Sequence, residues 1–87
     1  MVAKEVTILC KTGLESKMAA KLIQKASEYE SNIWIQKDER KANAKSLLGL
    51  LSLGISPGDK ITIITDGRDE EIALNDLEAF AKNGMTD

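Results

Sequence analysis

The order of hydrophobic patterns in this 87-residue chain predicts one α+β domain over residues 1–87, with a four-stranded antiparallel sheet and helices on one face. Several short segments alternate apolar and polar residues or are rich in β-branched residues, which is typical of strands. Other segments repeat apolar residues at helical spacing. They follow one another as strand, helix, strand, strand, helix, strand, helix, which predicts the split βαβ arrangement.

The first half of the chain changes from strand spacing to helix spacing and back. Residues 5–10 alternate, and the predicted buried side of this strand consists of Val6, Ile8 and Cys10. Residues 16–29 follow a helical period, and their apolar stripe consists of Ala19, Leu22, Ile23 and Ala26. Residues 33–36 alternate again as a second strand. The polar connector 37–40 and a short third strand over 41–43 predict a hairpin.

The second half contains the strongest strand and the last helix. Residues 61–65 are almost all β-branched, after a turn that contains Pro57 and Gly58. Asp69 is predicted to cap the last helix, whose first turn carries Glu70 and Glu71, acidic residues of the right sign for the positive end of the helix dipole. The apolar stripe predicted for this helix consists of Ala73, Leu77, Phe80 and Ala81.

The stretch over residues 43–54 is the most unusual in the chain. Ser46 stands at a predicted helix N-cap and Gly54 at the C′ position, on either side of Leu47, Leu48, Leu50, Leu51 and Leu53. A helix of about two turns cannot bury a leucine at nearly every position. Some of these leucines are therefore expected to be exposed beside the Ser46 hydroxyl and to form a docking surface. An ordinary capped core helix is the alternative.

Composition excludes several classes of function. The chain has no histidine, which removes histidine acid–base chemistry, phosphohistidine chemistry and the commonest metal ligand. We therefore expect no enzyme activity, no metal and no cofactor. A net charge of −2 with three aromatic residues predicts no direct nucleic-acid binding. The sequence lacks a signal-peptide pattern, a membrane span and a second cysteine, which predicts a cytoplasmic protein.

Three short motifs make the chain resemble the HPr family of phosphocarrier proteins. They are Lys-Thr-Gly-Leu at 11–14, Ala-Ala at 19–20, and Asn-Ala-Lys-Ser at 43–46 before the leucine run. The resemblance covers nearly the whole chain. It implies the open-faced β-sandwich of that family, with the order βαββαβα.

The family's histidine motif is altered here. The family window Gly-Leu-His-x-Arg-Pro-Ala-Ala has Glu15 at the position of the phosphorylated histidine, Lys17 at the arginine and Met18 at the proline. A carboxylate is a poor substitute for a nitrogen nucleophile that takes and releases phosphate. Lysine keeps the charge of arginine but lacks its two-pronged donor geometry. We infer that phosphate transfer through this position is lost.

The serine motif is intact, and the chain looks most like the Crh branch of the family, which lacks the histidine. The resemblance implies a non-catalytic phosphoprotein of bacterial carbon catabolite repression and transcription regulation. Its Ser46 would be phosphorylated by a serine kinase of the HPr kinase type. The phosphoprotein would then bind a LacI-type catabolite regulator through Leu47, Leu48 and Leu51, with Lys17 nearby.

Two alternatives remain open at this point. In the first, Glu15 imitates the phosphorylated state, and the chain binds proteins of the phosphotransferase system without carrying phosphate. In the second, residues 54–60 form a phosphate-binding loop of a small hydrolase or transferase. That loop lacks the full motif spacing and precedes a predicted strand instead of a helix.

Overall fold

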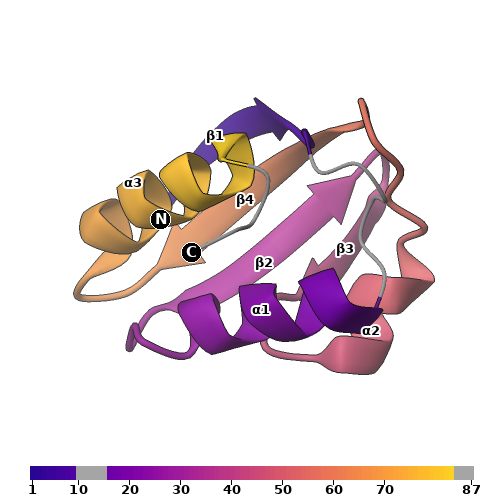
Figure 1. Ribbon diagram of the computed structural model, residues 1–87. Helices are drawn as coiled ribbons and strands as arrows, with labels where there is room; N and C mark the ends of the chain where they lie inside the picture. The colour runs from indigo at the N-terminus through magenta and orange to yellow at the C-terminus, as the bar shows by residue number, and fades with distance from the viewer. Residues whose placement is uncertain (10–15, 84–87) are drawn as a thin grey trace.

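The computed structural model describes residues 1–9 and 16–83, and these fold as a four-stranded sheet with three helices (Figure 1). The strands lie in the order β1-β4-β2-β3, and every neighbouring pair is antiparallel. The helices lie on one face of the sheet. The predicted fold class and element order are confirmed. The elements are β1 Val2–Thr7, α1 Ser16–Ala26, β2 Asn32–Lys37, β3 Arg40–Asn43, α2 Leu47–Ser52, β4 Lys60–Asp66 and α3 Glu70–Lys82.

Two elements, β1 and α1, differ from the prediction by more than one residue at an end. The first strand was expected over residues 5–10, but β1 ends at Thr7, because its pairing with β4 ends where Thr7 meets Lys60. Ile8 then bonds to the turn before β4, with its N–H donating to the Asp59 carbonyl oxygen at 2.8 Å. The predicted buried position Cys10 lies outside the described residues.

Helix α1 ends at Ala26, three residues before the expected end at Tyr29. The Ser27 N–H still donates four residues back, but the N–H groups of Glu28 and Tyr29 donate only three residues back, Tyr29 to the Ala26 carbonyl oxygen at 3.2 Å. This tightening is typical of the last turn of a helix, where the chain turns away from the axis.

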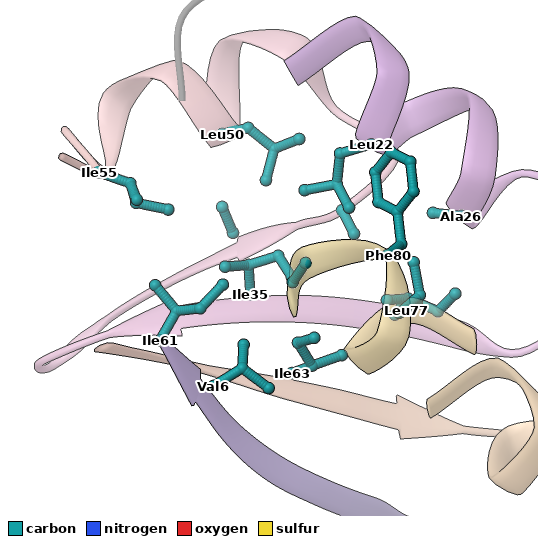
Figure 2. Packing of buried hydrophobic residues seen from close by; sticks show 14 of the residues in the cluster. Val6, Leu22, Ala26, Ile35, Leu50, Ile55, Ile61, Ile63, Leu77 and Phe80 are labelled. Carbon is teal, nitrogen blue, oxygen red and sulfur yellow. The ribbon is translucent and has the colours of Figure 1, made fainter. Parts of the chain in front are cut away.

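The core lies between the sheet and the helices, where apolar side chains from both layers interdigitate (Figure 2). The sheet contributes Val6, Ile33, Ile35, Ile61 and Ile63, all nearly inaccessible to solvent. The predicted stripes of both long helices face this layer and are buried, except that Ile23 is only partly covered. The helical and strand periods therefore identified the core correctly. In the part of the chain that the structure describes, no helix is long and apolar enough to span a membrane.

The prediction that the Asp69 side chain caps α3 is wrong. Asp69 stands at the N-cap position, but its carboxylate makes no bond to the helix. It accepts hydrogen bonds from the main-chain N–H groups of Glu30 at 2.9 Å and Ser31 at 3.0 Å, and from the Ser31 hydroxyl. Because Ser31 is 1% exposed, this carboxylate satisfies the N–H and hydroxyl of a residue that is almost closed to water. Asp69 thus joins the start of α3 to the chain between α1 and β2.

These bonds predict a pH dependence of stability. The hydrogen bond from the Ser31 hydroxyl, followed by that from the Glu30 N–H, lowers the pKa of Asp69 below its usual range. Because the pKa of Asp69 is lower in the folded protein than the value of about 4 in the unfolded chain, the ionised carboxylate stabilises the fold fully at pH values above about 4. This stabilisation is lost as the pH falls through the pKa of the folded protein. Asp69→Asn should therefore lower the free energy of unfolding at pH 7, and the difference from the parent protein should shrink below about pH 4.

Urea denaturation across that pH range measures this difference. Asp38→Asn is the matched control, because it removes one carboxylate from an exposed position whose φ of 55° asparagine tolerates well. A difference between Asp69→Asn and the parent that stays constant down to pH 2 would contradict the assignment.

Candidate functional site

Ser46 stands at the head of α2 in an extended conformation, with φ −113° and ψ 114°. Its Oγ accepts a hydrogen bond from the Gly49 N–H at 3.2 Å, which confirms the predicted N-cap. The predicted C′ glycine is also in place, because Gly54 has a φ of 63°. The Ser46 residue is half-buried. Its hydroxyl therefore holds the helix start while the residue remains at the molecular surface.

Gly49 keeps space for this hydroxyl, a role that the sequence analysis did not assign. A Cβ at position 49 would lie 3.2 Å from Ser46 Oγ and 3.3 Å from Ala42 Cβ on β3. Glycine therefore lets α2 approach the sheet without displacing the capping oxygen. One feature of the sequence could have indicated this role. A glycine has a low helix propensity, so its presence inside a leucine-rich helix suggests that a larger side chain would not fit there.

The leucines of α2 divide into an exposed set and a buried set. Leu48 is 81% exposed and Leu47 is 42% exposed, whereas Leu50 is completely buried and Leu53 nearly so. Leu51 is partly buried against the core, so only part of its side chain is available to a partner. The expectation that some leucines lie outside the core is confirmed. We call Ser46, Leu47, Leu48 and Leu51 together the α2 surface.

Two cations from the β2–β3 hairpin hold the other end of α2. The Arg40 guanidinium donates to the Ser52 carbonyl oxygen, and the Lys37 ammonium donates to the Gly54 carbonyl oxygen at 2.8 Å. Positive charge at the C-terminus of a helix interacts favourably with its dipole and satisfies its last carbonyl groups. Lys37 also lies 2.8 Å from the Asp59 carboxylate and lowers the pKa of that group. These contacts fix the orientation in which α2 presents its surface.

Helix α1 packs against α2 and adds positive charge beside the α2 surface (Figure 1). It has no acidic residue between Ser16 and Ala26, and Lys17 is exposed in its first turn. Lys17 is therefore accessible to solvent, and its contact with a partner stays a prediction. Glu15 lies outside the described residues, so its role as a phosphate mimic stays a prediction.

The turn over residues 54–60 is closed by its own hydrogen bonds. The Ser56 N–H donates to the Asp59 carboxylate at 2.8 Å, and the Asp59 N–H donates to the Ser56 carbonyl oxygen at 3.0 Å. A carboxylate therefore occupies the main-chain donor that a bound phosphate would need, and strand β4 follows the turn. In residues 1–9 and 16–83, no group of three or more cysteine, aspartate or glutamate side chains has a geometry that could hold a metal ion.

Comparison with known proteins agrees with this architecture. The family model described as the PTS HPr component phosphorylation site matches residues 2–83. The HPr-like protein Crh of Halalkalibacterium halodurans is 49% identical over 80 residues, which cover 92% of this chain and 95% of that protein.

Solved structures show the same similarity. HPr-C-His of Thermoanaerobacter tengcongensis has a TM-score of 0.93 at 38% identity, with 100% of this chain and 99% of that chain covered. Crh of Bacillus subtilis, described as an intertwined dimer with a swapped domain, has a TM-score of 0.78 at 39% identity, with both chains fully covered (100%). The chain therefore belongs to the HPr family, and the HPr-like Crh proteins are among the relatives that it resembles.

Proposed function

We propose that this chain is a non-catalytic regulatory protein of bacterial carbon catabolite control, switched by phosphorylation of Ser46. The observation that carries the proposal is the position of the Ser46 hydroxyl beside two exposed leucines, Leu47 and Leu48. A large apolar side chain that is 81% exposed at a rigidly held helix is suited to contact with a partner. The membership of the HPr family and the similarity to Crh proteins support the same function.

The modifying partner is a serine kinase of the HPr kinase type with ATP as phosphoryl donor. A bond forms between Ser46 Oγ and the γ-phosphorus of ATP, and the bond from that phosphorus to the ADP oxygen breaks. The hydroxyl proton passes to a base of the kinase, and ADP leaves. The product carries about −1.5 to −2 additional charge and three further acceptor oxygens at the α2 surface.

The reading partner is a LacI-type catabolite regulator. Its binding face should combine an apolar pocket for Leu47 and Leu48 with an arginine that pairs with the phosphate. It should also place acidic residues opposite α1, because Lys17 and Lys21 lie on a helix without acidic side chains. Unmodified Ser46 offers the apolar contact without the charge, so phosphorylation acts as the switch.

Incubation of the purified protein with the kinase and ATP, followed by mass measurement, tests the proposal. We expect one phosphoryl group on the parent protein and none on Ser46→Ala or Ser46→Asn. The asparagine variant keeps a capping oxygen, whereas alanine at an N-cap costs about 1 kcal/mol, so the pair separates loss of the hydroxyl from loss of the cap. Ser52→Ala is the matched control, since Ser52 is an exposed serine at the other end of α2.

Binding of the two forms to the regulator completes the experiment. The phosphorylated protein should bind, and the unmodified protein should bind at least about tenfold more weakly, as expected when a charge-assisted contact is missing. Absence of any mass gain, or a gain that persists in both position 46 variants, would remove the proposal.

A further inference from the structure

The connection between α1 and β2, residues 27–31, is held from two sides by side chains of opposite charge. On one side, the Lys45 ammonium donates to the carbonyl oxygens of Tyr29 at 3.1 Å and Ser31 at 3.3 Å. On the other side, the Asp69 carboxylate accepts the N–H groups of Glu30 and Ser31. The carbonyl groups of this connection therefore face a cation, and its N–H groups face an anion.

Lys45 directly precedes the serine of the α2 surface. Its main chain is fixed, because its N–H donates to Asn43 Oδ1 at 2.8 Å, while the residue as a whole is exposed. Consecutive Cα atoms are about 3.8 Å apart. A lysine has a flexible four-carbon stem, so its ammonium can reach a phosphoryl group on Ser46 by rotation about its own side-chain bonds.

A phosphoryl group on Ser46 would compete with the two carbonyl groups for this ammonium. The bonds from the ammonium to the two carbonyl oxygens already have an ionised donor, but a phosphoryl group would add the attraction of an opposite charge of about −1.5 to −2 on an adjacent residue. The Tyr29 carbonyl oxygen lies near the surface and would turn to water, so the main cost is the loss of the 3.3 Å bond to the carbonyl oxygen of Ser31, which is 1% exposed. The competition therefore favours the phosphate.

We infer that Lys45 couples the charge on Ser46 to the α1–β2 connection, which loosens when Ser46 is phosphorylated. The inference rests on the proposed function for the identity of the modified residue. The Asp69 bonds remain, and the Tyr29 hydroxyl still donates to the Asp76 carboxylate on α3 at 2.5 Å. The connection therefore becomes more mobile without unfolding. Phosphorylation changes two surfaces, the α2 surface and the connection, although it modifies one hydroxyl.

Protein made with phosphoserine incorporated at position 46 during synthesis tests this coupling. Amide hydrogen exchange at Glu30 and Ser31 should become about fivefold faster than in the unmodified protein, the effect expected from losing one or two ordinary hydrogen bonds. The carbonyl ¹³C shifts of Tyr29 and Ser31 should change in the same comparison.

Three lysine variants assign the effect to one side chain. In Lys45→Met, exchange at the connection should be fast already, and phosphoserine should add no further change. Lys45→Arg keeps the cation and should keep the response. Lys41→Met is the matched control, because Lys41 lies on β3 with its ammonium 5.2 Å from the Trp34 ring and away from the connection.

Unchanged exchange at Glu30 and Ser31 in the phosphoserine protein would overturn the inference, as would a full response in Lys45→Met. Because incorporation needs no kinase, the result does not depend on enzymatic phosphorylation. Failure of the kinase reaction counts against the proposed function alone, and failure of the exchange experiment counts against the coupling alone.

Discussion

Leu50→Ala is expected to lower the free energy of unfolding by about 3 kcal/mol, within the range measured for fully buried leucines. Leu50 is completely buried, and Figure 2 shows its side chain pointing from α2 into the layer between the helices and the sheet. Truncation removes its transfer free energy and leaves a cavity that the strands cannot close. A typical domain is stable by only about 5–15 kcal/mol, so this change is large.

The same substitution at Leu48 provides the control. Leu48 is 81% exposed, so Leu48→Ala should change the free energy of unfolding by less than about 0.5 kcal/mol. Urea denaturation of both variants measures the difference, with equal m-values showing that the same surface is exposed on unfolding. Equal losses of stability in the two variants would mean that the structure assigns the leucines of α2 to the wrong sides.

Leu48→Ala should have a large effect on recognition although it hardly changes stability. It should weaken binding of the phosphorylated protein to its regulator about tenfold or more, as truncation of a central apolar contact does. The leucine is already exposed in the free protein and would become buried only in the complex. Its contribution therefore appears in the dissociation constant and not in the stability of the fold. Isothermal titration calorimetry with the phosphorylated variant and parent measures this loss.

Ile72→Ala is the matched control for binding, because Ile72 is 62% exposed on α3 and away from the α2 surface. It should leave the affinity within about twofold, as for exposed positions outside an interface. An equal loss of affinity in Ile72→Ala and Leu48→Ala would show that the regulator does not use the α2 surface.

Much of the fold could be predicted from local patterns. The period of two in the strands and the period near 3.6 in the helices placed Ile33, Ile35, Leu22 and Leu77 in the core, where they lie. The capping position of Ser46 and the C′ role of Gly54 were also readable, because both depend on main-chain geometry within a few residues. The motifs around the altered histidine window pointed to the family that the comparisons confirm.

The part that failed involved contacts between segments far apart in the sequence. Asp69 has the residue type and position of a helix cap, but its carboxylate binds Glu30 and Ser31 instead. The start of β1 was missed because a strand is defined by its partner, and β4 pairs with residues that carry no alternating pattern, such as Ala3 and Lys4.

The sequence by itself determined the order of elements, the core face of the two long helices and the serine that begins α2, because these depend on spacing along the chain. Only the tertiary structure decided that Leu48 faces solvent while Leu50 is buried, that Gly49 leaves room for Ser46, and that Lys45 holds the α1–β2 connection. A run of leucines has no polar side of its own. The position of the sheet beneath α2 therefore selects which leucines a partner can reach.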